Sequence, residues 1–149
     1  MMIREYDPWD SDRLYEISLS SLDQLYREEM FTFFYTQWPK GQIVACDYSG
    51  RPVGFLSSTK TDTFSARIVM LAVDRSHRSL GLGSKLITEL KRISMMNGIY
   101  NISLEVRISN TRAMNFYRRH GFVPTEFLRN YYDDGGDALR MNTIIQLNI

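Results

Sequence analysis

Apolar residues along this chain follow two spacings, one typical of helices and one typical of strands. The clearest helical spacing lies in 81–96, where the apolar stripe consists of Leu82, Leu86, Leu90 and Ile93. Alternating apolar residues at 101–106 are typical of a strand with one buried face. An almost continuous apolar run at 66–73 predicts a strand buried on both faces.

Turn and breaker residues divide the rest of the chain into further elements. Ser49-Gly50 joins two strands in a hairpin, and Asn97-Gly98 ends the long helix. We expect strands over 3–6, 42–48, 52–59, 66–73, 101–106, 122–128 and 139–147, and helices over 8–20, 22–35, 81–96 and 110–120. The order β-α-α-β-β-β-α-β-α-β-β predicts an α+β or mixed α/β fold. Because no linker, repeat or low-complexity tract interrupts it, we expect one domain over 1–149.

Composition narrows the classes of function. With 44% hydrophobic residues, 23% charged residues and a net charge of +1, the chain is typical of a globular protein. It offers no bulk charge for nucleic acid or an anionic membrane, so we expect neither as a partner. The N-terminus has no apolar signal region, and no apolar run reaches the roughly 18 residues of a membrane span. We therefore expect a cytoplasmic location.

Cysteine and histidine usage argues against a disulfide or a metal. The single cysteine, Cys46, excludes an internal disulfide, and its apolar surroundings favour a core position over a reactive thiol. His77 and His120 have no partner at ligand spacing. The aspartates of 133–137 do not alternate as in a calcium loop, which favours a solvated turn. We expect no metal.

The most informative segment is the glycine-containing loop 78–84, which follows an apolar strand and opens the long helix. The first turn of a helix has backbone N–H groups without an intrahelical partner, and the helix dipole adds partial positive charge. Gly81 and Gly83 would let a phosphate approach the backbone closely. The basic residues nearby are Arg75, Arg78 and Lys85. The segment therefore predicts a pyrophosphate site.

Two common phosphate motifs do not fit this loop. A dinucleotide fingerprint needs glycine where Leu86 stands, and a P-loop needs glycine where Arg78 stands. The segment Arg78-Ser79-Leu80-Gly81-Leu82-Gly83 instead resembles the pyrophosphate loop Gln/Arg-x-x-Gly-x-Gly/Ala of the GNAT (Gcn5-related) N-acetyltransferases.

Two further blocks extend this resemblance. Residues 104–122 contain Glu-Val-Arg-x-Ser-Asn, followed by Ala113, Tyr117 and Gly121-Phe122, and are similar to the RimI-type and archaeal protein N-terminal acetyltransferases. Residues 131–138 are similar to the Tyr-Tyr-x-Asp-Gly-x-Asp-Ala hairpin of that branch. The resemblance covers about residues 3–147. It implies the GNAT fold: a mixed, mostly antiparallel seven-stranded sheet with flanking helices, whose fourth and fifth strands are parallel and splayed.

The resemblance implies that acetyl-CoA is the cosubstrate. Its pantetheine arm would pair with strand backbone in the gap between the splayed strands, and its pyrophosphate would bind the glycine loop. The implied cofactor-binding residues are Leu71, Ala72, Val73, Arg78, Ser79, Leu80, Gly81, Leu82, Gly83, Ser84, Asn110, Asn115 and Tyr117. The purely structural alternatives are a core strand, a glycine-permissive loop and, at Asn110, a helix N-cap.

The resemblance also implies two catalytic residues and a substrate entrance. Tyr117 would protonate the departing thiolate, and Glu105 would act through water as general base. An α-amine, with a pKa of about 7.7–8.0, needs less help than lysine at about 10.4. The tyrosines that match the peptide entrance of the family are Tyr26, Tyr131 and Tyr132. The alternatives are packing or surface aromatics and, for Glu105, a carboxylate paired with an arginine.

Two positions depart from the relatives. Gln24 occupies the position of a usual glutamate, and Arg67 that of a frequent histidine, which favours Glu105 as the base. We expect direct acetyl transfer to protein or peptide N-termini, including ribosomal or nascent chains, by a monomer or homodimer. Acetylation of a small amine or a protein lysine remains open, as does a non-catalytic acetyl-CoA-binding regulator.

Overall fold

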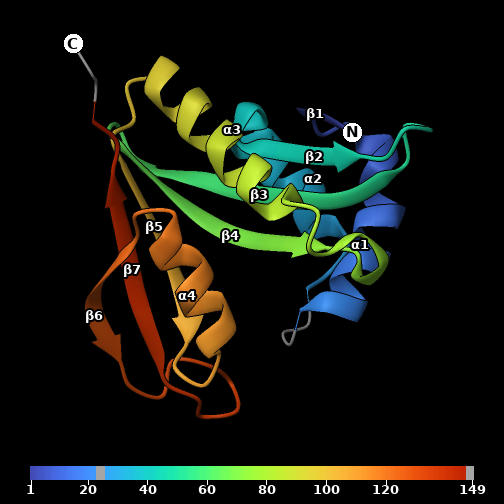
Figure 1. Ribbon diagram of the computed structural model, residues 1–149. Coiled ribbons are helices and arrows are strands. Elements are labelled where there is room, and N and C mark those ends of the chain that lie inside the picture. The colour runs from blue at the N-terminus through green and yellow to red at the C-terminus, as the bar shows by residue number, and fades with distance from the viewer. Residues whose placement is uncertain (23–25, 147–149) are drawn as a thin grey trace.

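In a computed structural model, which describes residues 1–22 and 26–146, seven strands form one sheet in the order β1-β2-β3-β4-β5-β7-β6 (Figure 1). The strands are β1 Met2–Glu5, β2 Gln42–Cys46, β3 Pro52–Asp62, β4 Ser65–Val73, β5 Asn101–Arg107, β6 Val123–Leu128 and β7 Ala138–Ile144. Neighbouring strands are antiparallel except β4 and β5, which are parallel. The predicted mixed, mostly antiparallel sheet is confirmed.

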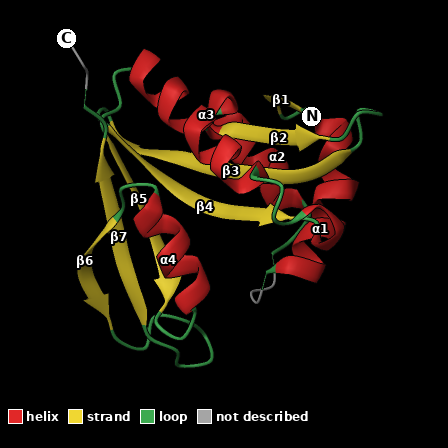
Figure 2. Cartoon of the chain, viewed as in Figure 1, coloured by secondary structure: helices red, strands yellow, loops and turns green. Residues whose placement is uncertain are grey.

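Helices cover both faces of the sheet (Figure 2). On one face, α3 (Leu82–Met96) and α4 (Thr111–Arg119) pack over the core; on the other lie α1 (Ser11–Ser21) and α2 (Glu29–Gln37). Short 3₁₀ turns occupy Pro8–Asp10, Pro39–Gly41 and Arg75–His77.

The predicted stripe of α3 forms much of the core beneath it. Leu82, Leu86 and Leu90 are at most 2% exposed, whereas Ile93 is only half-buried and Ile87 is buried beside them. Burying one such side chain contributes about 1.5–3 kcal/mol, which anchors the N-terminus of α3 next to the end of β4. Cys46 is fully buried, as expected for a core residue.

The parallel strands β4 and β5 separate after a short paired stretch. Their register covers only Ser65 to Arg67 of β4 against Asn101 to Ser103 of β5. Beyond that point the two strands diverge, and α4 lies in front of β5 (Figure 1). The splay is confirmed, and it leaves the later half of β4 with no strand on that edge.

A β-bulge near the point of divergence changes the face of the sheet on which the buried side chains of β4 lie. Ser57 pairs with Met70 and Ser58 with Ile68, so Val69 is the extra residue. Before the bulge, Ile68 packs toward α3; after it, Met70 packs toward α1 and α2. The prediction that 66–73 is buried on both faces is confirmed only in part: buried residues pack on both faces, but they alternate with half-buried ones. Two of these half-buried residues, Leu71 and Val73, border the cavity described below.

Two helix starts also differ from the predictions. The helix expected over 8–20 begins at Ser11, because Asp7 caps a 3₁₀ turn and accepts a hydrogen bond from the Trp9 N–H (2.9 Å). The helix expected over 22–35 begins at Glu29. Phe31 is the buried residue of that helix, and Phe34 and Tyr35 are partly buried against the same core.

Candidate active site

The loop between β4 and α3 has the geometry of an anion site. Ser79 and Gly81 have left-handed backbone conformations (φ 67° and 78°), and the right-handed helix begins at Leu82. A left-handed residue followed by a right-handed one turns successive N–H groups toward the same side. In the first backbone hydrogen bond of α3, the Lys85 N–H donates to the Gly81 carbonyl (3.1 Å). The N–H groups of 82–84 therefore lack an intrahelical partner and fit a pyrophosphate.

The two glycines of this loop are required for different reasons. A Cβ on Gly81 would meet no atom within 4 Å, but its left-handed φ favours glycine. A Cβ on Gly83 would lie 3.1 Å from Cζ of Phe116 on α4. The sequence interpretation ascribed both glycines to phosphate approach; in the structure, Gly83 allows α3 and α4 to pack closely.

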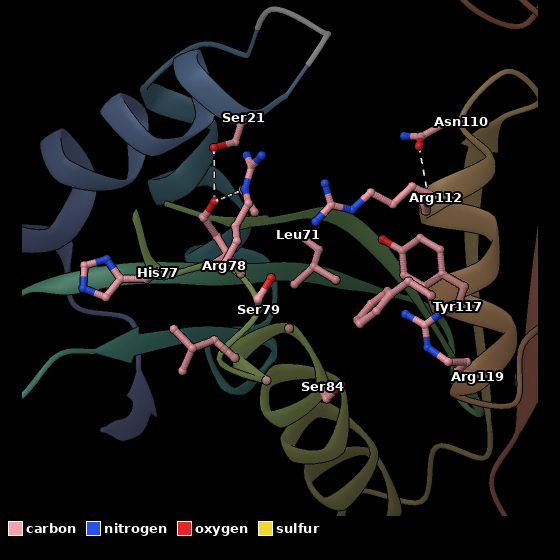
Figure 3. Close-up of a pocket in the computed structure, with 17 residues that line it drawn as sticks. Ser21, Leu71, His77, Arg78, Ser79, Ser84, Asn110, Arg112, Tyr117 and Arg119 are labelled. Carbon is pink, nitrogen blue, oxygen red and sulfur yellow. Dashed lines mark hydrogen bonds between the residues drawn. The ribbon is translucent and has the colours of Figure 1, made fainter. Parts of the chain in front are cut away.

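Arg78 fastens the loop to the end of β4. Its Nε donates to the Val73 carbonyl (3.1 Å), which also accepts a longer hydrogen bond from Ser21 Oγ of α1 (3.4 Å; Figure 3). The guanidinium is thus held at the end of β4 and lines the same cavity as residues 81–84, where it can add charge to an anion site.

A cavity of about 480 Å³ lies between β4, this loop and α4 (Figure 3). The predicted cofactor-binding residues that line it are Leu71, Ala72, Val73, Arg78, Ser79, Gly81, Leu82, Gly83, Ser84, Asn110 and Tyr117. Leu80 and Asn115 are not brought to it. Leu80 is 53% exposed on the loop, and Asn115 lies on the exposed side of α4.

The cavity also has cationic residues that the sequence interpretation missed. Arg112 and Arg119 line it, whereas the expected Arg75 and Lys85 do not. Both arginines extend from α4 toward the cavity (Figure 3). The missed signal was helical spacing, because Arg112, Phe116 and Arg119 stand at i, i+4 and i+7 and share one face. The other lining residues not foreseen are Ser21, His77 and Ala113.

Asn110 caps α4 at the rim of the cavity. Its Oδ1 accepts from the Ala113 N–H (3.1 Å), which confirms the N-cap reading of this residue. Contact with the cofactor stays a prediction for Asn110.

Tyr117 reaches from α4 to the cavity wall opposite β4 (Figure 3). Its ring packs against Phe116 (5.3 Å between centroids) and Phe122 (5.7 Å). Burial raises the pKa of its phenol well above the usual value, and the nearby Tyr26 and Tyr132 raise it further. The phenol therefore stays protonated over the whole neutral range, as a proton donor requires.

The three predicted entrance tyrosines lie near Tyr117, either directly or through a neighbouring ring. Tyr26 and Tyr132 interact electrostatically with Tyr117, and Tyr131 meets Tyr132 edge to face at 5.0 Å. None of the three lines the cavity. Tyr117 is therefore the link between the cavity and this tyrosine cluster, which we define as Tyr26, Tyr131 and Tyr132.

Glu105 lies next to the tyrosine cluster in a network of charged residues. Its side chain is 4% exposed and accepts hydrogen bonds from Arg67 Nε (2.6 Å), Tyr131 Oη (3.0 Å) and Arg140 Nε (3.4 Å). Arg140 also pairs with Glu126 (2.5 Å). The arginine-paired carboxylate that the sequence left open is thus present, and Arg67, at the position of the relatives' histidine, supplies one partner. Gln24, the other departure, lies outside the described residues.

Residues 1–22 and 26–146 contain neither a candidate metal site nor a candidate membrane span. No group of three or more His, Cys, Asp or Glu side chains there could hold a metal ion. No helix in that part of the chain is long and apolar enough to cross a membrane.

Comparison with known proteins agrees with this geometry. The model of the acetyltransferase (GNAT) family matches residues 11–122. An uncharacterised N-acetyltransferase of Methanocaldococcus jannaschii is 34% identical over 95% of this chain and 90% of its own length. The NAA10 catalytic subunit of the N-terminal acetyltransferase A complex of Arabidopsis thaliana is 34% identical over 83% of this chain and 67% of its own length. The crystal structure of Ard1 from Thermoplasma volcanium superposes with a TM-score of 0.94, at 34% identity and 98% coverage of both chains.

Proposed function

Because the chain belongs to the GNAT acetyltransferase family and has the GNAT fold, we propose that it transfers acetyl from acetyl-CoA to the free α-amine of protein or peptide N-termini. Relatives with names that include N-terminal or N-alpha-acetyltransferase support this substrate. The observation that carries the proposal is the position of Tyr117, between a cavity suited to a pyrophosphate and a cluster of tyrosines suited to a peptide.

The cavity is the proposed site of acetyl-CoA, which supplies a thioester open to attack by an amine. The N–H groups of 82–84 and the Arg78 guanidinium would hold its pyrophosphate. Arg112 and Arg119 would add positive charge along the same wall. The unpaired edge of β4 after Arg67 would pair with the amides of the pantetheine arm.

Two residues move protons in this proposal. Tyr117 donates a proton to the sulfur that leaves, since its buried phenol remains protonated at neutral pH. Glu105 accepts the proton of the incoming ammonium through a water molecule. That water would lie beside Tyr131, which hydrogen-bonds Glu105 and is itself 40% exposed. Arg67 and Arg140 hold the Glu105 carboxylate in place.

Direct transfer, without an acetyl-enzyme, is also proposed. The single cysteine is fully buried in the core toward α1 and α2 and does not line the cavity. Initial-rate lines at several fixed concentrations of acetyl-CoA should therefore intersect. Parallel lines would indicate an acetyl-enzyme and contradict direct transfer.

The base is tested by Glu105→Gln. We expect kcat/KM for a peptide to fall about a hundredfold at pH 7, within the usual contribution of a general base. The deficit should shrink toward pH 9, because the α-amine then loses its proton to the solvent (pKa about 7.7–8.0). A deficit of the same size at every pH would assign Glu105 a positioning role only.

The substrate is tested with matched peptides. Turnover on free N-termini, and none on a peptide with a blocked N-terminus and an internal lysine, supports the proposal. The reverse result would make the chain a lysine acetyltransferase of the same fold. The expected cytoplasmic location and the monomeric or homodimeric state stay predictions.

A further inference from the structure

Arg107 occupies the junction between the cofactor side and the substrate side of the site. It is the last residue of β5, and its carbonyl accepts from the N–H of Asn110, the cap of α4 (2.9 Å). Its side chain runs in the other direction, to the loop 129–137 between β6 and β7. There the guanidinium lies over the ring of Tyr132, with Cζ 4.1 Å from the ring centroid.

A second set of contacts fixes the loop around the same guanidinium. Nη1 of Arg107 donates to Asp134 Oδ1 (3.1 Å), and this oxygen also accepts from the Gly136 N–H (2.9 Å). The Tyr132 N–H donates to the Gly136 carbonyl (3.1 Å), and the Gly135 N–H to the Tyr132 carbonyl (2.8 Å). The backbone from Tyr132 to Gly136 thus forms a closed turn, and the guanidinium contacts the ring at its start.

Glycine at 136 is required by this arrangement. A Cβ at that position would lie 2.4 Å from Nη1 of Arg107, closer than any real contact. The Arg107 side chain is only 18% exposed, against 63% for Asp134, so the guanidinium has little room to move aside. The ion pair with Asp134 therefore holds the guanidinium against Tyr132, and glycine at 136 leaves the space that the guanidinium occupies.

We propose that Arg107 is a positioning residue that holds Tyr132, and through their ring contact Tyr131, at the substrate side of Tyr117. The proposal rests on the proposed function, because it assumes that a peptide N-terminus passes the tyrosine cluster. Tyr131 has its own anchor on Glu105, so the two tyrosines are held by two residues of the same strand, β5. Loss of the Arg107 anchor should loosen Tyr131 and Tyr132 on the substrate side. The cofactor cavity should not change, because Arg107 does not line it.

The test uses two variants that disturb the contacts of Arg107 with Tyr132 and Asp134 in different ways. Arg107→Gln removes the charge, and Gly136→Ala keeps it but displaces the guanidinium. Both should raise KM for a free-N-terminus peptide at least tenfold and change KM for acetyl-CoA less than twofold. Arg107→Lys, which keeps a cation but loses the planar fork, should fall between them and wild type. The matched control is Arg129→Gln, an exposed arginine of the same loop, which should behave as wild type.

Amide hydrogen exchange supplies a readout that needs no turnover. In Arg107→Gln, the amides of Tyr132, Gly135 and Gly136 should exchange at least tenfold faster, whereas those of α3 should not change. Unchanged exchange in the loop, or an unchanged peptide KM in a variant whose loop has loosened, would overturn the positioning role. Equal increases in both KM values would overturn it as well. If the wild-type protein turns over no peptide with a free N-terminus, the proposed function is refuted instead. Amide exchange then still shows whether Arg107 holds the loop.

Discussion

Replacement of Tyr117 by phenylalanine isolates the proposed acid. The substitution removes one oxygen and keeps the ring that packs against Phe116 and Phe122. Within the described residues, no group hydrogen-bonds the phenol oxygen, so its removal strands no partner. We expect the free energy of unfolding to change by less than about 1 kcal/mol.

The rate should change far more than the stability. A positioned acid contributes about 10² to 10⁴ in rate, and a thiolate is a good leaving group, with a thiol pKa of about 8.5 for a model cysteine. The low end therefore applies: a fall in kcat of about a hundredfold, equal to roughly 2.7 kcal/mol. Because the pKa of Tyr117 is raised, wild-type kcat should not fall from loss of this proton up to about pH 10.

The assay is release of coenzyme A at saturating acetyl-CoA and peptide, beside a thermal unfolding curve. Tyr48→Phe is the control, since Tyr48 is 90% exposed and outside the cavity. A Tyr117→Phe enzyme with kcat within threefold of wild type would refute the assignment of Tyr117 as the acid. A large loss of stability would refute the packing argument.

Three further predictions concern the loop and α4. Gly83→Ala should destabilise the fold by about 1–3 kcal/mol in chemical denaturation, because the new Cβ would press on Phe116. Adding Phe116→Leu should recover part of this loss. A Gly83→Ala protein as stable as wild type would contradict the packing. Burial, together with nearby Lys91 and Arg119, lowers the pKa of His120, whose ring contacts Ser84 Oγ (2.9 Å). In the unfolded chain His120 binds a proton near pH 6.5, whereas in the folded state it does so only at lower pH. The free energy of unfolding should therefore decrease on acidification below about pH 6.5. His120→Gln should reduce this dependence of stability on pH, and an unaltered dependence would exclude His120 as its source. Asn110→Ala should cost about 0.5–2 kcal/mol in thermal denaturation through loss of the cap, whereas Asn110→Asp should cost much less.

The sequence predicted the parts of the fold that depend on local spacing. The α3 stripe, the Asn110 cap and the glycine loop each follow from a few neighbouring residues, and the structure contains all three. The bulge at Val69 was missed because it depends on the register between two strands, and no residue type at that position specifies it.

Most of the predicted residues that line the cavity belong to continuous motifs, although Leu80 of the glycine loop lies outside it, and the lining residues that were missed arise from packing. Arg112 and Arg119 lie between motif positions, and only the orientation of α4 brings them to the cavity. The Arg67–Glu105 pair joins residues from two strands, so neither residue alone indicates it. Gly83 could be identified from the sequence as a required glycine, but the neighbour that requires it, Phe116, belongs to another helix.

The most direct test of the central claim is coenzyme A release with acetyl-CoA and matched peptides. One set carries free N-termini that begin with Ser, Ala, Met-Leu or Met-Glu, and the control has a blocked N-terminus and an internal lysine. Turnover confined to the free N-termini is the result we predict. Turnover confined to the blocked lysine peptide would contradict the proposed substrate and leave the fold and the cofactor site standing.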